Sequence, residues 1–131
     1  VSACAATPCQ VAAIEALEGP QDHLKYMVEQ YRLRRDYVMR RISEIPGLSC
    51  HAPAGTFYAF IDISQLGMPC EEFAMKLLEE RQVVVVPGTA FGEFGEGYIR
   101  LSYATSMQCL EQGLQELEEF VRSHKTEGDP A

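Results

Sequence analysis

The amino-acid sequence predicts an α+β fold of two layers, in which a sheet of three to four strands carries helices mainly on one face. In the longer segments, apolar residues recur every three or four positions, as on one face of a helix. In short segments between them, apolar residues alternate with others, as in strands. The resulting order is helix, helix, strand, strand, helix, strand, strand, helix. With 131 residues, 47% of them hydrophobic and 23% charged, the chain has the composition of a globular protein and the length for one core.

Two helices are predicted first. Residues 7–10 have the pattern of a helix start, with Thr7 as the cap, and this helix is expected to end near Glu18. From residue 21 to residue 45 the apolar positions repeat at spacings of three, four and seven, which predicts one long amphipathic helix. At 1.5 Å per residue this helix would be roughly 37 Å long, so we expect it to connect two bodies rather than lie within one.

The middle of the chain is predicted to form strands around one helix. Alternating apolar residues and a Pro-Ala-Gly turn between them predict strands at residues 48–51 and 56–63. Residues 70–82 carry their apolar side chains on one helical face. The four consecutive valines at 83–86 predict a strand that is buried on both sides.

The last part of the chain is predicted to form a glycine-rich loop at residues 87–97, a strand at residues 98–103 and a helix. Ser106 or Thr105 can cap that helix, and residues 125–131 form a polar tail. Alternation in the strand separates a core-facing set from a set on the opposite face: Ile99, Leu101 and Tyr103 against Tyr98, Arg100 and Ser102.

Composition argues against several classes of function. The net charge of −8 would repel nucleic acid and anionic lipid, and no stretch approaches the ~20 apolar residues of a membrane span. The five cysteines are odd in number and lack the spacing of zinc ligands, so reduced thiols in a cytoplasmic protein are the simplest interpretation. The three histidines are far apart and predict neither a hydrolytic triad nor a metal site.

Arg100 is the most informative candidate for chemistry. A guanidinium on the non-core face of a strand, next to a glycine loop, can bind a carboxylate through two parallel hydrogen bonds. Residue type alone favours the alternative of an arginine that is solvated or paired with a surface acid. Tyr58 and Phe60 are interpreted as core residues or pocket walls.

Two further patterns are interpreted as structural or solvated features rather than as sites of chemistry. The glycine loop lacks the Gly-Lys-Ser/Thr ending of a phosphate-binding loop, and Glu93 and Glu96 would repel a phosphate, so we expect a connection between strands. The arginines between residues 32 and 41 are interpreted as a solvated helix face, with an acidic partner surface as the alternative.

Three segments together resemble successive signatures of class I, fold type I, pyridoxal-phosphate-dependent aminotransferases. They are PAGTFYAFIDIS at 53–64, VVVVPGTAFG at 83–92 and GYIRLSYATS at 97–106, in matching order and spacing. The resemblance covers roughly residues 1–120 and is strongest to the aspartate-aminotransferase-like subgroup. It implies a division into the last helix of an absent large domain at 1–19, a connecting helix at 20–46, a small C-terminal domain at 47–124 and the tail at 125–131.

The same resemblance implies the chemistry. Members use pyridoxal phosphate, held by a lysine as a Schiff base, to exchange an amino group between an amino acid and a 2-oxo acid. Arg100 matches the arginine that binds the substrate α-carboxylate, and Tyr58, Phe60, Gly88 and Thr89 match the wall of the substrate entrance. The full-length enzyme is expected to be a homodimer without nucleic-acid or membrane partners.

The sequence departs from the family pattern in lacking the Schiff-base lysine. The matching lysine, the phosphate-binding arginine and the phosphate cup lie upstream of the region matched here. We therefore expect no catalytic residue, no bound cofactor and no turnover in this chain alone. Three alternatives stay open: a free-standing carboxylate-binding regulatory module, an interaction domain that uses the long helix, and part of a fold type I β-lyase.

Overall fold

A computed structural model describes residues 4–124 of the chain, and the polar tail expected at 125–131 lies outside that range. The residues group into two compact units, one up to Gln30 and one from Tyr31 onward. No helix in the described range is long and apolar enough to cross a membrane.

The first unit contains α1 (Thr7–Glu18) and the beginning of α2 (Asp22–Glu44). The prediction of Thr7 as the cap is wrong. The extended residue before the helix is Ala6, so Thr7 already lies within the first turn, and no side chain caps it. No residue of α1 is buried, and Leu17 is 81% exposed.

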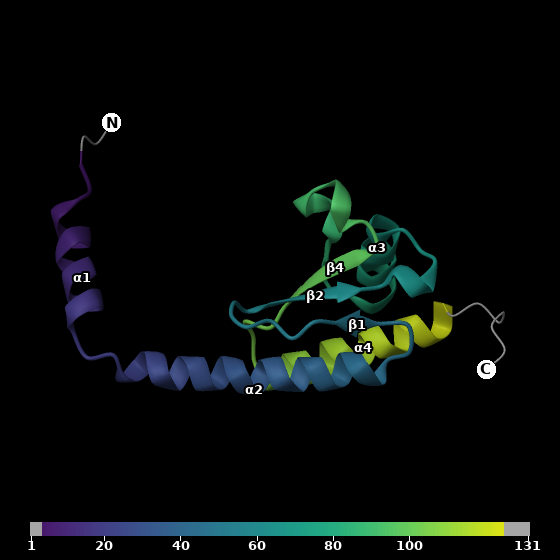
Figure 1. Ribbon diagram of the computed structural model, residues 1–131, viewed down its shortest axis with the longest axis horizontal. Helices are drawn as coiled ribbons and strands as arrows, with labels where there is room; N and C mark the ends of the chain where they lie inside the picture. Colours follow the sequence, from purple (N-terminus) through teal and green to yellow (C-terminus); the bar gives the residue numbers. More distant parts are fainter. Residues whose placement is uncertain (1–3, 125–131) are drawn as a thin grey trace. The chain divides into compact units, whose positions relative to one another are not determined.

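The second unit is built around a four-stranded antiparallel sheet, which confirms the predicted α+β class (Figure 1). Along the sheet the order is β1, β2, β4, β3. The bounds are Ser49–Cys50 for β1, Tyr58–Asp62 for β2, Val86–Pro87 for β3 and Tyr98–Ser102 for β4. The two long strands, β2 and β4, pair over their full length, with Phe60 opposite Arg100.

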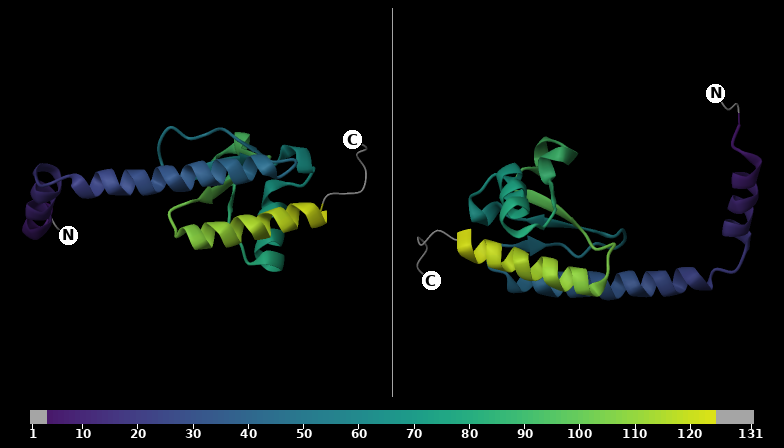
Figure 2. Two further views of the ribbon diagram at one scale, coloured as in Figure 1. Left: turned by 90° about the horizontal axis from the view of Figure 1, so that it is seen from below. Right: turned by 180° about the vertical axis from the view of Figure 1, so that it is seen from behind.

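One face of the sheet forms the core. Ile61 of β2 and Ile99 of β4 belong to a buried cluster together with side chains of the C-terminal half of α2, of α3 (Cys70–Arg81) and of α4 (Met107–His124). In this unit α4 runs beside the end of α2, where Arg41 forms an ion pair with Glu118 at 2.8 Å (Figure 2). The alternation predicted for residues 98–103 is confirmed, since Ile99, Leu101 and Tyr103 are all buried.

The valine run departs from its prediction. Instead of a strand buried on both sides at 83–86, only Val86 and Pro87 pair with β4, and β3 lies at an edge of the sheet. Val84 is 73% exposed, although Val85 is buried. A run of apolar residues reveals strand propensity but not position in a sheet, and the missing N–H of Pro87 suits an edge strand.

Candidate functional site

Arg100 lies in the middle of β4, on the face of the sheet away from the core. Its direct neighbours across the sheet are Phe60 of β2 and Val86 of β3. Arg100 is half-buried, whereas its neighbours Ile99 and Leu101, which face the core, are buried. The strand therefore holds a permanent cation on a partly shielded surface.

The contacts of Arg100 are aromatic. Its Cζ atom lies 4.2 Å from the ring centroid of Tyr58 and 4.4 Å from that of Phe91. Phe60 completes the group, with its ring stacked on Tyr98 at 5.1 Å and meeting Phe91 edge-on at 6.1 Å. We name the four rings of Tyr58, Phe60, Phe91 and Tyr98 the aromatic cluster. The structure thus places the predicted Tyr58 and Phe60 beside Arg100.

No carboxylate within residues 4–124 forms an ion pair with Arg100. The alternative of an arginine paired with a surface acid is therefore not realised in the described chain. In contrast, the arginines of α2 are largely engaged: Arg35 pairs with Asp36, and Arg41 with Glu44 and Glu118. The N–H groups of the Arg100 guanidinium have no hydrogen-bond partner among residues 4–124.

Phe91 belongs to the P-G-T-A-F-G loop that the resemblance places at the substrate entrance, but the sequence did not single it out. It ends the short helical turn η2 (Gly88–Phe91), which follows β3 directly and is followed by a second turn, η3 (Glu93–Gly95). The turns fold back so closely that a Cβ atom on Gly95 would lie 1.9 Å from the carbonyl oxygen of Gly88. The glycine content indicated a loop of unusual backbone freedom, but not which of its side chains would return to the sheet.

The predicted wall residues Gly88 and Thr89 have other contacts. Gly88 is buried where it crosses Gly95, and the Thr89 hydroxyl donates to the Glu71 carboxylate of α3 at 3.1 Å. Thr89 thus fastens the loop to α3, and Gly88 lies where the two turns of the loop cross.

Glu96 anchors the far end of the glycine loop. One of its carboxylate oxygens accepts the backbone N–H of Cys70, in the first turn of α3, at 2.9 Å, and the other accepts the Cys70 thiol at 3.4 Å. The backbone hydrogen bond from Cys70, followed by that from its thiol, holds the pKa of Glu96 below its ordinary value of 4.5. The negative charge also suits the positive end of a helix.

This anchor predicts an acid-sensitive contribution to stability. Because the pKa of Glu96 is lower in the folded state, its contribution is fully present above about pH 4.5 and is lost as the pH falls through the folded-state pKa. We expect the free energy of unfolding to fall less on acidification in Glu96→Gln than in the wild type. Urea titrations at several pH values measure this free energy. Glu93→Gln, on the same loop, is the control, and an equal change in both variants would contradict the assignment.

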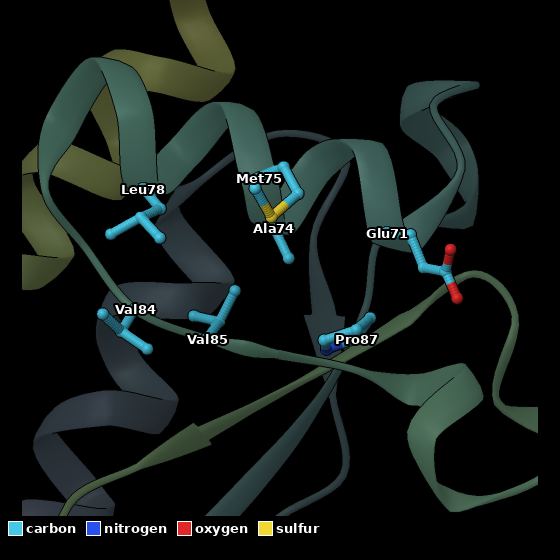
Figure 3. A pocket seen from close by; sticks show the side chains of 7 residues that line it. All are labelled: Glu71, Ala74, Met75, Leu78, Val84, Val85 and Pro87. Atoms are coloured by element: carbon cyan, nitrogen blue, oxygen red, sulfur yellow. The ribbon is translucent and has the colours of Figure 1, made fainter.

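An apolar pocket of about 300 Å³ lies between α3 and the edge of the sheet (Figure 3). Its lining is aliphatic apart from Glu71, and consists of Ala74, Met75, Leu78, Val84, Val85 and Pro87. The Glu71 carboxylate already accepts the Thr89 hydroxyl. The pocket therefore offers apolar contact without converging reactive groups.

Both lysines within residues 4–124 lie beside carboxylates. The pKa of Lys76 is raised, chiefly by its hydrogen bond to Glu72. Lys25 is ion-paired with Asp22 at 3.0 Å. The glycine loop presents the carboxylates of Glu93 and Glu96 rather than a cation. Residues 4–124 also contain no cluster of three side chains that could hold a metal ion.

Comparison with known proteins gives consistent matches. The family model described as aminotransferase class I and II matches residues 2–117. An aspartate aminotransferase of Pyrococcus horikoshii is 42% identical over 118 residues, which cover 88% of this chain and 30% of that protein. Aromatic-amino-acid aminotransferase 2 of Thermococcus litoralis is 40% identical over 124 residues, covering 93% of this chain and 32% of that protein.

A solved structure agrees with these matches. The alanine aminotransferase from Pyrococcus furiosus superimposes with a TM-score of 0.88 at 38% identity, covering 92% of this chain and 31% of that one. The chain thus spans about 30% of the length of the relatives that it matches.

Proposed function

Because the chain belongs to the aminotransferase class I and II family, we propose that it forms the small domain of an amino-acid aminotransferase, in which Arg100 binds the α-carboxylate of the substrate. The substrates of the whole enzyme are then an amino acid and a 2-oxo acid, with pyridoxal phosphate as the cofactor. The family resemblance of the Arg100 segment and the surroundings of Arg100 both support this role.

The observation that carries the proposal is an arginine that is half-buried on a regular strand and has no carboxylate partner among residues 4–124. Guanidinium groups bind carboxylates through two parallel, charge-assisted hydrogen bonds, which fix the orientation of the ligand as well as its position. The strand on which Arg100 lies is paired on both edges, so its backbone is held in place. Rigid elements of this kind position a binding group precisely.

The contribution of these residues to the reaction is binding and orientation. The side chains that contact Arg100 are aromatic rings, so this neighbourhood supplies a carboxylate anchor and not the amine of a Schiff base. The groups that hold and activate the cofactor would belong to the part of the enzyme that this chain does not span. The named relatives act on aspartate, alanine or aromatic amino acids, so no side-chain preference is proposed.

The full-length enzyme is proposed to be a homodimer, as the family resemblance implies. In the first unit, α1 exposes Val11, Ile14 and Leu17, and we propose that this apolar surface is covered in the full-length enzyme.

Carboxylate binding tests the proposal directly. Pyruvate, a small 2-oxo acid, should produce a saturable NMR shift of the Arg100 side-chain Nε–Hε signal in the isotopically labelled chain. Methyl pyruvate has nearly the same shape but no carboxylate charge, and it should leave the signal unchanged. If neither compound shifts the signal, or if both shift it equally, Arg100 is not a carboxylate site.

Turnover by the chain alone is expected to be absent. A mixture of the 131-residue protein, an amino acid, a 2-oxo acid and pyridoxal phosphate should show no amino-group transfer above the rate without protein, because the family's Schiff-base lysine lies upstream of the segments that this chain matches. Product formation is measured by chromatography of the amino acids. Any protein-dependent rate would contradict this expectation. A rate that survives replacement of all three lysines, Lys25, Lys76 and Lys125, by arginine would show in addition that catalysis does not need a Schiff-base lysine.

A further inference from the structure

The two rings on Arg100 come from opposite neighbours of its strand. Tyr58 belongs to β2, which pairs with one edge of β4, and Phe91 follows β3, which pairs with the other edge. Their centroids lie 4.2 Å and 4.4 Å from the guanidinium carbon, which is closer than the 5.4 Å separations of Arg34 from Tyr31 and of Arg40 from Tyr37 on α2. The contact is therefore tighter at Arg100 than at these two stacked arginines of the long helix.

Contact with two rings restricts both the side chain and its ligand. The face of an aromatic ring is electron-rich, so it attracts the guanidinium and repels an anion. A carboxylate is thereby directed away from the rings and toward the in-plane N–H groups, where it can form paired hydrogen bonds. An arginine that is already oriented also loses less rotamer freedom when the ligand binds.

Both rings are connected to defined parts of the fold, and Phe91 remains 52% exposed. Tyr58 is fixed by the register of β2 on β4, two residues from the position opposite Arg100. Phe91 is held by the close crossing of Gly88 and Gly95 and by the edge-on contact with Phe60. The backbone of the glycine loop thus sets the position of Phe91, and Phe91 in turn contacts Arg100.

We propose that Tyr58 and Phe91 are positioning residues, which hold the Arg100 guanidinium so that its N–H edge meets the substrate carboxylate. This inference rests on the proposed function of Arg100 as a carboxylate ligand. The rings do not bind the carboxylate themselves, and the Tyr58 hydroxyl is not required.

The test measures the dissociation constant of pyruvate from the 131-residue chain through the Arg100 Nε–Hε signal. Replacing each ring by an aliphatic side chain, Tyr58→Leu or Phe91→Leu, should weaken binding about threefold, and the double variant about tenfold. The aromatic exchanges Tyr58→Phe and Phe91→Tyr should stay within about twofold of the wild type. The matched control is Phe94→Leu, on the same loop, because Phe94 is 90% exposed.

The outcomes separate the two proposals. No saturable pyruvate shift in the wild-type chain overturns the carboxylate site and its positioning together. A wild-type shift with an unchanged dissociation constant in the double leucine variant overturns the positioning alone. If a leucine variant does not fold, nuclear Overhauser contacts in the wild type decide: Arg100 Hδ and Hε should contact ring protons of Tyr58 and Phe91, and their absence overturns the inference.

Discussion

Gly95→Ala is expected to unfold the glycine loop and to destabilise the protein by about 3 kcal/mol, at the upper end of the usual cost of overpacking. The added Cβ atom would lie 1.9 Å from the carbonyl oxygen and 2.2 Å from the carbonyl carbon of Gly88. Both are backbone atoms, so no side-chain rotation can relieve the clash. The two turns of the loop must separate, and Phe91 then loses its position against Arg100.

Urea unfolding followed by circular dichroism measures this loss of stability. A glycine-to-alanine substitution elsewhere in the chain, which should raise the stability, is the control. Gly113 lies inside α4, and a methyl group added there would meet no atom within 4 Å. Gly113→Ala should therefore stabilise the protein by about 0.8 kcal/mol through helix propensity. Gly95→Ala should also weaken pyruvate binding. A Gly95→Ala protein within about 0.5 kcal/mol of the wild type would show that the crossing is not tight in solution.

The sequence was most informative where a local pattern and tertiary burial agree. The helix predicted at 70–82 is observed as Cys70–Arg81, and the strand predicted at 98–103 as Tyr98–Ser102, because the residues that set the periodicity are those that the core buries. Phe57 shows the limit of this agreement. The alternation groups it with the core residues of the strand, yet it lies just before β2 and is 39% exposed.

The candidate site could be predicted only in part. The alternation in β4 placed Arg100 on the outer face, but only the family resemblance assigned it a role. The contact with Phe91 depends on two glycines that cross seven residues apart, and no periodicity encodes such a crossing. The edge position of β3 could not be predicted from the sequence either. It depends on how the strands pair with one another in the sheet, and not on the valines themselves.

Arg100→Gln should strongly weaken carboxylate binding. Glutamine keeps a polar side chain but is shorter than arginine, has no charge and cannot offer the paired N–H groups of a guanidinium. Hydrogen bonds to charged groups contribute about 1.5–3 kcal/mol, so the dissociation constant of pyruvate should rise more than about tenfold. Binding in this variant is followed by calorimetry or by the backbone amide signals of β4, since the reporter side chain is gone.

Arg40→Gln is the matched control for this loss of charge. Arg40 is also stacked on a tyrosine ring, that of Tyr37, but it lies on the exposed surface of α2. If pyruvate bound the acidic chain through general attraction to arginines, both variants would weaken binding equally. Selective loss of binding in Arg100→Gln would instead locate the ligand on β4. There Arg100 contacts two aromatic rings, has no carboxylate partner among residues 4–124, and lies on a strand that is paired at both edges.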